Sequence, residues 1–343
     1  MVSKRPTCPS CSTKFSSWGR TTSGKKRYGC RKCLRTRIYK KQVRKQDLFS
    51  LFKQYILWGL TYQMLSSISG FSLAHLVSKF HEYLSQKPPE SPLVDQSNLE
   101  AAYLLLDGLW FGRYFVLMVY RQSGNLIILH ISVAGREVKT KISRDLKHLL
   151  KLGYRFSGIV SDGGTGIVAA VEEILPHAPH QICLAHMHRD IVNCLGRYPK
   201  DPRIKQLKLL SDLIWLIESK EALRYWNRQV KDWAHKNFNF LEETRKDAET
   251  GKRWYIHKGA RKAVRILLKL PETSFTFLTH PLMPKTTNEL EASFGHLGKR
   301  WLSHRGLKKE RWENFMNWFV YFYNQEKLSQ SIKKNAVNIN TKS

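Results

Sequence analysis

Two Cys-x2-Cys pairs near the N-terminus have a spacing that suggests a defined chemistry. Cys8 and Cys11 form the first pair and Cys30 and Cys33 the second, with 18 residues between the pairs. Structural zinc is held by four soft ligands in a tetrahedron, and two such pairs supply two thiolates each. The sequence therefore predicts a zinc ribbon with bound Zn²⁺ over residues 1–45. A set of free or redox-active thiols is the alternative.

Two aspartates that follow apolar runs suggest a second kind of metal site. Asp107 comes after Tyr-Leu-Leu-Leu and before Gly108, and Asp162 comes after Gly-Ile-Val-Ser and before two glycines. A carboxylate in such surroundings is costly to bury unless a cation or another partner balances it. Either Asp alone could be a turn former or a helix cap. Two of them at the ends of neighbouring strands can share divalent cations through oxygen.

The hydrophobic pattern predicts the elements that would position these aspartates. Apolar, β-branched and aromatic runs predict five strands, at residues 101–107, 114–121, 126–133, 156–161 and 180–185. Helical patterns predict two helices between the later strands, at 140–152 and 166–175. The order β-β-β-α-β-α-β is the layout of an RNase H-like core. We therefore predict an α/β fold with the first part of that core over 98–189.

Helices are predicted on both sides of this core. Residues 190–275 are almost wholly helical in pattern and predict a helical insertion, whose tryptophans are expected mainly in the core, although one could stack on an unpaired base. Residues 276–328 should complete the core, with helices over about 287–302 and 308–328.

The segment before the core predicts a helix-turn-helix over residues 46–86. Gly70 separates two helical patterns, and Ser72 would cap the second helix at its N-terminus. Such a helix can lie in the DNA major groove, with His75 and Lys79 on its exposed face. A helical hairpin packed on the core is the alternative. Residues 87–97 contain three prolines, which predicts a linker.

Charge indicates the class of partner. The chain has 58 basic and 27 acidic residues, a net charge of +31, and residues 1–45 hold 15 Lys and Arg and no Asp or Glu. Nucleic acid is the natural partner, with an anionic membrane surface as the competitor. Basic side chains interleaved with Trp18 and Tyr28 suit phosphate contact and base stacking, a solvated basic face being the alternative. The candidates are Arg20, Lys25, Lys26 and Arg27.

Targeting signals are not apparent in the sequence. The N-terminus lacks a signal-peptide pattern, and the longest apolar runs are shorter than the ~20 residues that cross a bilayer. We expect a cytoplasmic, nucleoid-associated protein without a membrane partner.

In their order and spacing these motifs resemble those of Mutator-like DDE transposases of bacterial insertion sequences, some of which carry a zinc ribbon before a helix-turn-helix. The matching residues are Asp107-Gly108, Ser161-Asp162-Gly163, Cys183-x2-His186 and Thr287-Asn288-Glu289-Leu290-Glu291. The resemblance implies that Glu291 is the third catalytic carboxylate beside Asp107 and Asp162, with Asn288 in a supporting role. It also implies that Cys183 and His186 shape the site.

The resemblance implies a DNA transposase. The three carboxylates would hold two Mg²⁺ (or Mn²⁺) ions for cleavage at the transposon ends and for strand transfer. Its partners would be the terminal inverted repeats and target DNA, both double-stranded, and a second copy of the chain, because two ends must be joined. One alternative is a non-catalytic zinc-ribbon/helix-turn-helix DNA-binding regulator derived from a transposase. The other is a nuclease of repair or RNA processing.

Two assignments within the motifs remain open. Glu289 competes with Glu291, because the two flank a helical stripe of apolar residues on opposite sides. Glu291 shares its side with Gly295 and Gly298, where DNA could approach closely, and this favours Glu291. Cys183 and His186 could bind zinc only with help from another ligand, such as His180 or His188. A core Cys beside a hydrogen-bonded His is the alternative.

Overall fold

The computed structural model describes residues 7–22, 24–38, 47–89, 102–124, 127–270, 272–304 and 306–340. They belong to two compact units, Met1–Phe52 with Thr61–Lys79 and Lys53–Leu60 with Phe80–Ser343. Most of the predicted linker over 87–97 lies outside the described residues. Within the part that is described, no helix combines the length and the apolarity that crossing a membrane requires.

The first unit begins with a small Cys-rich module. Strands β1 (Ser16–Arg20), β2 (Lys26–Gly29) and β3 (Thr36–Ile38) form an antiparallel sheet in that order. Its core of buried residues consists of Cys8, Phe15 and Cys30. An apolar core of this size supplies little folding free energy, and modules so small usually need a metal or disulfides.

Three helices follow: α1 (Leu48–Trp58), α2 (Tyr62–Ser69) and α3 (Leu73–Leu84). The Thr61 hydroxyl caps α2 by accepting a hydrogen bond from the Met64 N–H, and Gly70 ends the helix with φ +74°. The Ser72 hydroxyl accepts from the His75 N–H at 3.3 Å, which confirms the predicted cap of the second helix.

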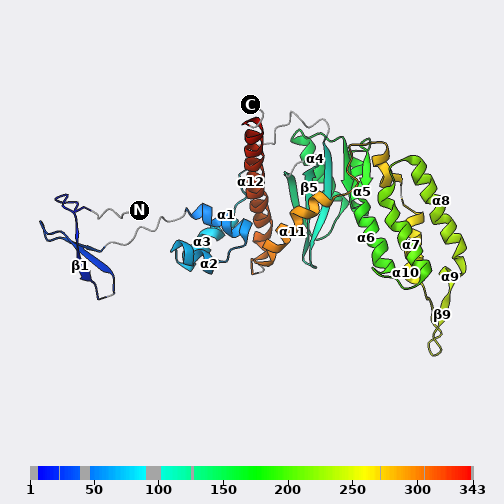
Figure 1. The fold of residues 1–343 in the computed structure, drawn as a ribbon, viewed down its shortest axis with the longest axis horizontal. Helices are drawn as coiled ribbons and strands as arrows, with labels where there is room; N and C mark the ends of the chain where they lie inside the picture. The colour runs from blue at the N-terminus through cyan, green and yellow to red at the C-terminus, as the bar shows by residue number, and fades with distance from the viewer. Residues whose placement is uncertain are drawn as a thin grey trace. The chain divides into compact units, whose positions relative to one another are not determined.

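The second unit contains a mixed five-stranded sheet. Strands β4 (Tyr103–Phe111), β5 (Phe115–Gln122) and β6 (Ile128–Ala134) are antiparallel neighbours, and β7 (Gly158–Ser161) and β8 (His180–Ile182) add in parallel beside β4. The spatial order is β6-β5-β4-β7-β8, and Figure 1 shows this sheet, labelled at β5. Helices α4 (Lys139–Lys151) and α5 (Thr165–Ile174) make the crossovers, so the predicted element order is present.

The two faces of this sheet are covered by different helices. Leu104 and Leu106 of β4 pack in one buried cluster with α4 and α5 residues such as Ile142 and Ile167. Asp107 alternates to the opposite face, where α11 (Asn288–Leu302) packs against β4 and α12 (Trp312–Asn340) against β6. Because strand side chains alternate between faces, Asp107 points away from the larger apolar cluster.

The segment after β8 is helical, with one exception. It contains helices α6 (Leu184–Leu195), α7 (Pro202–Asp212), α8 (Lys220–Lys236), α9 (Phe238–Glu242) and α10 (Lys258–Leu268). The 3₁₀ turn η2 (Leu213–Leu216) joins α7 to α8, and η3 (Glu272–Leu278) follows α10. The segment was predicted to be almost wholly helical, and the exposed hairpin of β9 (Thr244–Lys246) and β10 (Arg253–Tyr255) is the part that prediction missed. Its turn is fixed by the Asp247 carboxylate, which accepts from the Thr250 N–H, and by Gly251 at φ +68°.

Three other boundaries differ from expectation. Strand β4 continues to Phe111, so Asp107 lies within a strand and not at its end. The strand expected over 180–185 ends at Ile182, because helix α6 begins at Leu184. The last helix was expected over 308–328, whereas α12 runs over Trp312–Asn340 after the short 3₁₀ turn η4 (Lys309–Arg311).

Candidate active site and zinc site

Asp107 is the most deeply buried of the predicted catalytic carboxylates, with 3% of its surface exposed. The Gly108 N–H donates to its Oδ1 at 2.8 Å, and the Thr287 hydroxyl donates to its Oδ2 at 3.1 Å. Burial, together with the negative charge of Asp162, raises the pKa of Asp107 to about 6, although His186 opposes the shift. A cation beside this carboxylate would relieve the cost of burying its charge.

Asp162 lies one residue beyond the end of β7. Leu106 pairs with Ser161 in parallel strands. Asp107 and Asp162 are the residues that follow this pair, so they lie at neighbouring positions. The Asp162 Oδ1 accepts from the Gly164 N–H at 2.9 Å, in a turn where Gly163 has φ +81°. An L-residue with a side chain rarely adopts that conformation, so the turn after Asp162 requires glycine.

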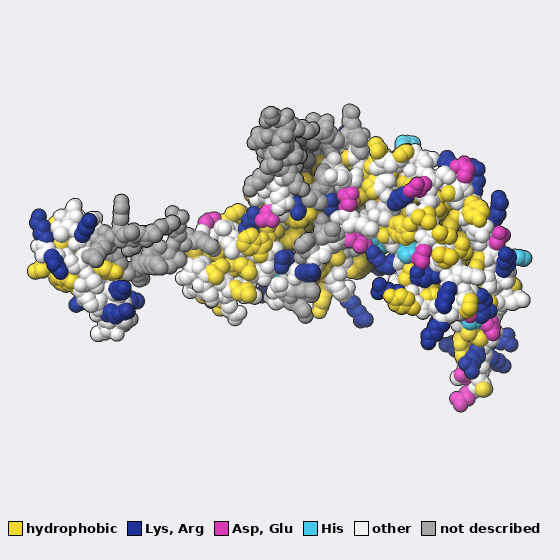
Figure 2. Space-filling view, viewed as in Figure 1, with side chains coloured by type: hydrophobic (Ala, Val, Ile, Leu, Met, Phe, Trp, Pro, Cys, Tyr) yellow, Lys and Arg dark blue, Asp and Glu magenta, His cyan; other side chains and the backbone are white. Residues whose placement is uncertain are grey.

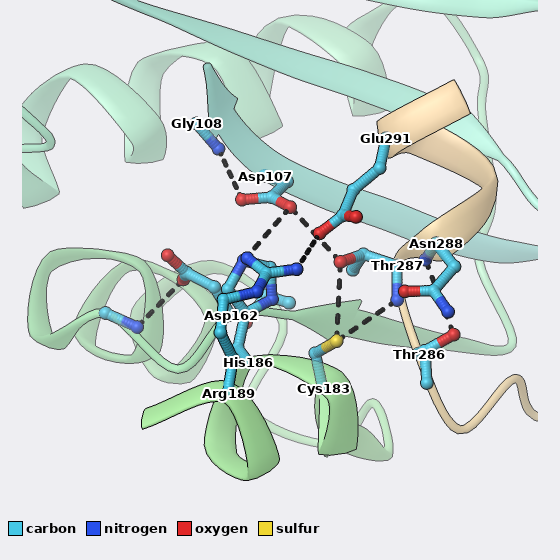
Figure 3. Close-up of polar contacts among 12 residues, drawn as sticks. Asp107, Gly108, Asp162, Cys183, His186, Arg189, Thr286, Thr287, Asn288 and Glu291 are labelled. Carbon is cyan, nitrogen blue, oxygen red and sulfur yellow. Dashed lines mark hydrogen bonds and ion pairs between the residues drawn. The ribbon is translucent and has the colours of Figure 1, made fainter. Parts of the chain in front are cut away.

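Glu291 comes from the far end of the chain, in the first turn of α11. One ligand atom each from Asp107, His186 and Glu291 lie within 4.8 Å of one another (Figure 3). The two carboxylates supply oxygen ligands of the kind that Mg²⁺ or Mn²⁺ takes, whereas an imidazole nitrogen is not a ligand that Mg²⁺ prefers. Asp162 is not a member of this group, although its charge acts on Asp107.

A guanidinium occupies one oxygen of Glu291. Arg189, on α6, donates to Glu291 Oε1 at 2.5 Å, and this bond raises the pKa of the arginine (Figure 3). The two side chains are 50% and 38% exposed, so the pair is partly hydrated. A cation bound by Glu291 would compete with Arg189 for the same oxygen.

Cys183 and His186 are both connected to Asp107. Cys183 is the N-cap residue of α6, and its buried thiol accepts from the N–H of Thr287 at 3.3 Å. The Nε2 atom of His186 lies 3.7 Å from Asp107 Oδ2. A hydrogen bond with Cys183 and the charge of Asp107 raise the pKa of His186 to about 9. The imidazole is therefore a cation at neutral pH while the site holds no metal.

A zinc site at Cys183 and His186 would need further ligands, and the two candidate histidines contact other residues. The Nε2 of His180 contacts the Ser161 hydroxyl at 2.8 Å, and the Nε2 of His188 contacts Asp212 at 2.8 Å. Thr287 instead joins Cys183 to Asp107, because its hydroxyl contacts both side chains. Asn288, expected in a supporting role, begins α11, and its backbone N–H donates to the Thr286 hydroxyl at 3.4 Å.

Glu289 faces a different part of the molecule from Glu291. Its Oε2 accepts from Arg121 Nη2 and from the Gly124 N–H, each at 3.3 Å, and its backbone carbonyl accepts from Arg121 Nη1. Arg121 is only 2% exposed, and Glu289 is one of the groups that balance its buried guanidinium. The arrangement engages Glu289 in a structural ion pair and favours Glu291 at the site.

Glu137 is an acidic residue at the site that the sequence analysis missed. A Cβ on Gly108 would lie 2.1 Å from its Oε1, and a Cβ on Gly164 would lie 3.1 Å from its Oε2. The Trp110 indole donates to Glu137 Oε1 at 3.1 Å. Burial and the charge of Asp162 raise the pKa of Glu137. Glu137 precedes α4 in a short connection without an apolar run, so no pattern marked it in the sequence.

The four predicted zinc ligands converge in the Cys-rich module. Cys8 Sγ lies 3.4 Å from Cys33 Sγ, Cys11 Sγ lies 3.3 Å from Cys30 Sγ, and all four sulfurs lie within 4.8 Å of one another. These distances are far longer than a disulfide bond of about 2.05 Å. They are close to the edges, about 3.8 Å, of a tetrahedron with metal–sulfur distances of about 2.3 Å. The donor set and its geometry fit Zn²⁺.

The predicted DNA-contact residues are distributed along the first unit. Four basic side chains of the Cys-rich module are exposed: Arg20, Lys25, Lys26 and Arg27. Trp18, predicted to stack on bases, is half-buried and lies over Gly29, where a Cβ would be 2.2 Å from its ring. On α3, His75 is exposed and stacks on Phe71, whereas Lys79 is half-buried.

Comparison with known proteins gives two findings. Residues 115–253 match the family described as "Transposase, Mutator family". A segment of 104 residues, 30% of the chain, is 34% identical to the "Transposase for insertion sequence element ISRM5" of Rhizobium meliloti (strain 1021), and the match spans 26% of that protein's length. The segment from β5 to the β9–β10 hairpin is therefore a Mutator-family transposase domain.

Proposed function

We propose that this protein is a DDE transposase that binds the ends of a mobile DNA element and catalyses metal-dependent strand cleavage and strand transfer. One observation carries the proposal. Asp107 and Glu291, which lie far apart in the sequence, converge with His186 in a chain whose residues 115–253 match the Mutator family, with ligand atoms within 4.8 Å of one another. Asp162 is the third catalytic carboxylate of the proposal, since its charge acts on Asp107.

The side chains of the site would have different roles in phosphodiester cleavage. A pair of divalent cations, when bound, would activate the attacking oxygen and stabilise the leaving oxygen. Asp107, Asp162 and Glu291 would hold the cations, and Thr287 and Gly108 orient Asp107 by hydrogen bonds. Protonated His186 stabilises the buried charge of Asp107 until a cation arrives. The same site would direct water at the element's ends and then the freed 3′-hydroxyl at target DNA.

We propose the same division of the chain into domains that the sequence predicts. Residues 1–45 form a zinc ribbon with Zn²⁺ on Cys8, Cys11, Cys30 and Cys33, supported by the converging sulfurs. Residues 46–86 form a helix-turn-helix, supported by the caps at Thr61 and Ser72. Residues 98–189 and 276–328 form an RNase H-like core around the helical insertion over 190–275. Its sheet order, β6-β5-β4-β7-β8, supports that assignment.

The partners of the proposal are the terminal inverted repeats and target DNA, both double-stranded, and a second copy of the chain. The net charge of +31 supports a nucleic-acid partner. A homodimer is proposed because two element ends must be cut and joined together. The protein would act in the cytoplasm on the nucleoid.

The test is strand cleavage of duplex DNA that carries the element's ends. Asp107→Asn, Asp162→Asn and Glu291→Gln each keep the size of the side chain and remove its charge. We expect each variant to bind the ends but to cleave them more slowly by about a hundredfold or more, since the cations stabilise most of the developing charge.

Glu289→Gln is the matched control on the same helix. It removes one carboxylate charge two residues from Glu291, at the ion pair with Arg121, and folded protein should keep most of its cleavage activity. Cleavage by Glu291→Gln at a near wild-type rate would overturn the proposal. End binding by the wild-type chain without cleavage in Mg²⁺ or Mn²⁺ would favour the non-catalytic regulator instead.

A further inference from the structure

A cleft in the second unit begins at Asp162 and runs between α5 and α10. It has a volume of about 800 Å³, which is within the ~300–1,000 Å³ typical of ligand pockets. Its floor is largely apolar and includes Val171, Ile182 and Met187. Asp162 is a lining residue at one end, so a molecule in the cleft would reach the proposed catalytic carboxylates.

One wall of the cleft is cationic. Lys262, Arg265 and Lys269 line it from α10 and the residue just beyond, three and four positions apart, which places them on one side of the helix. All three are exposed, whereas the other side of α10 is buried through Ala260, Ala263, Val264 and Leu267. No ion pair joins these three cations to an acid in the described part of the chain. They are therefore available to an anion that comes from outside.

The facing wall has the opposite character. It is formed by α5, from which Val168 and Glu172 line the cleft. Among the described lining residues, Glu172 and Asp162 are the acids. An occupant with one polyanionic side and one apolar, neutral side would fit these walls, with its anionic side toward α10. In Figure 2, Lys and Arg side chains gather over the helical region that includes α10 and the β9–β10 hairpin.

We infer that this cleft binds one strand of DNA, which passes from the proposed active site along α10. The phosphates of a strand would contact Lys262, Arg265 and Lys269, and its sugars and bases would cover the apolar floor. A blunt duplex hides its bases, so only an unpaired segment could use both surfaces. The inference rests on the proposed function for the identity of the ligand, and it assigns the path of the strand beside Asp162.

The test compares binding of two fluorescently labelled DNAs to the full-length, zinc-loaded chain by anisotropy, in buffer without Mg²⁺ or Mn²⁺ so that no cleavage occurs. One DNA is a blunt duplex, and the other is the same duplex with a single-stranded extension of about ten nucleotides. The variant Lys262→Gln/Arg265→Gln/Lys269→Gln should bind the extended DNA at least about tenfold more weakly. Its slope of log affinity against log salt should fall by about 2, because each single-strand phosphate contact contributes about 0.7. Affinity for the blunt duplex should stay within about twofold.

The matched control is Lys220→Gln/Arg228→Gln/Lys231→Gln, which removes three exposed cations from α8, outside the cleft. It should not distinguish the two DNAs. Equal losses in both triple variants, or equal losses for blunt and extended DNA, would overturn the inference. Unchanged DNA binding with an altered sedimentation coefficient would also overturn it, in favour of a second copy in the cleft. Failure of the proposed function has a separate signature, which is extension-dependent binding without cleavage once Mg²⁺ is added.

Discussion

The Cys-rich module and the carboxylate site are two candidate metal centres built in opposite ways. The four cysteines belong to a module whose buried core is Cys8, Phe15 and Cys30, so two of the buried residues are themselves ligands. Asp107 instead lies on a strand of a sheet with a large apolar cluster on its other face. In the first region the metal would create the fold. In the second, the fold creates a costly buried carboxylate that a metal would stabilise.

Removal of zinc should give the largest difference between the two regions. Structural zinc sites contribute about 10–16 kcal/mol to folding, more than the small apolar core of residues 1–45 can replace. We expect one tightly bound zinc per fragment of residues 1–45 and loss of both metal and fold in Cys30→Ser. Metal analysis and circular dichroism of the fragment measure both. A fragment that stays folded without zinc would contradict the idea that the metal creates the fold of this region. Unfolding of the sheet domain by a chelator would contradict the idea that the second region folds without metal.

Removal of residues 1–45 should have the next largest effect, on DNA affinity. Each phosphate contact on duplex DNA contributes about 0.9 to the slope of log affinity against log salt. Because this segment carries 15 basic and no acidic residues, the truncated chain should show a clearly flatter slope. Cleavage chemistry at saturating DNA should change far less. An unchanged slope in a binding titration across salt concentrations would exclude the segment from the DNA interface.

Asp107→Asn should stabilise the metal-free protein while abolishing cleavage. The folded-state pKa of Asp107, about 6, lies above its ordinary value of 3.8. Its contribution to stability is therefore fully present below pH ~3.8 and is lost as the pH rises through ~6. The variant escapes that loss, which is at most about 3 kcal/mol. Its melting temperature in EDTA should exceed that of the wild type at pH 7.5, with the gap closing toward pH 4. Equal melting temperatures at pH 7.5 would mean that the buried charge of Asp107 does not destabilise the folded protein.

Arg189→Gln tests the smallest effect, competition between a guanidinium and a cation for Glu291. The Arg189–Glu291 pair is partly exposed, so its loss should free the carboxylate by less than about 1 kcal/mol. Mn²⁺ binding by calorimetry without DNA should tighten by about twofold to fivefold. The control is the variant Arg203→Gln, which breaks an ion pair with Asp201 that involves no residue of the carboxylate site. It should leave the Mn²⁺ affinity unchanged. Weaker Mn²⁺ binding in Arg189→Gln would show that the arginine supports the metal site.

Helices and strands whose apolar residues recur with a clear period were predictable from the sequence. The strands and crossover helices around Asp107 and Asp162 follow from apolar runs and helical stripes, because burial imposes those periods. The caps at Gly70 and Ser72 follow from local backbone chemistry. The cysteine spacing predicted the convergence of four sulfurs, since two Cys-x2-Cys pairs can close one tetrahedron.

Contacts between distant segments were not predictable in the same way. The ion pair of Glu289 with buried Arg121 joins α11 to β5, and only the fold places them together. Glu137 and Arg189 reach the site from a short connection and a helix surface, where no periodic pattern distinguishes them. The β9–β10 hairpin was missed because its short, exposed strands bury no alternating apolar face.

The two glycines beside Glu137 have a consequence for the genetics of the element. A methyl group on Gly108 would lie 2.1 Å from the Glu137 carboxylate, so even alanine there must displace it. If the proposed function holds and cleavage depends on Glu137, a copy of the gene with its Asp107, Asp162 and Glu291 codons intact would lose activity by one base change at codon 108, which would push the flexible end of the Glu137 side chain aside. A census of functional copies in a genome that counts only the three acidic codons would then overestimate how many can still move.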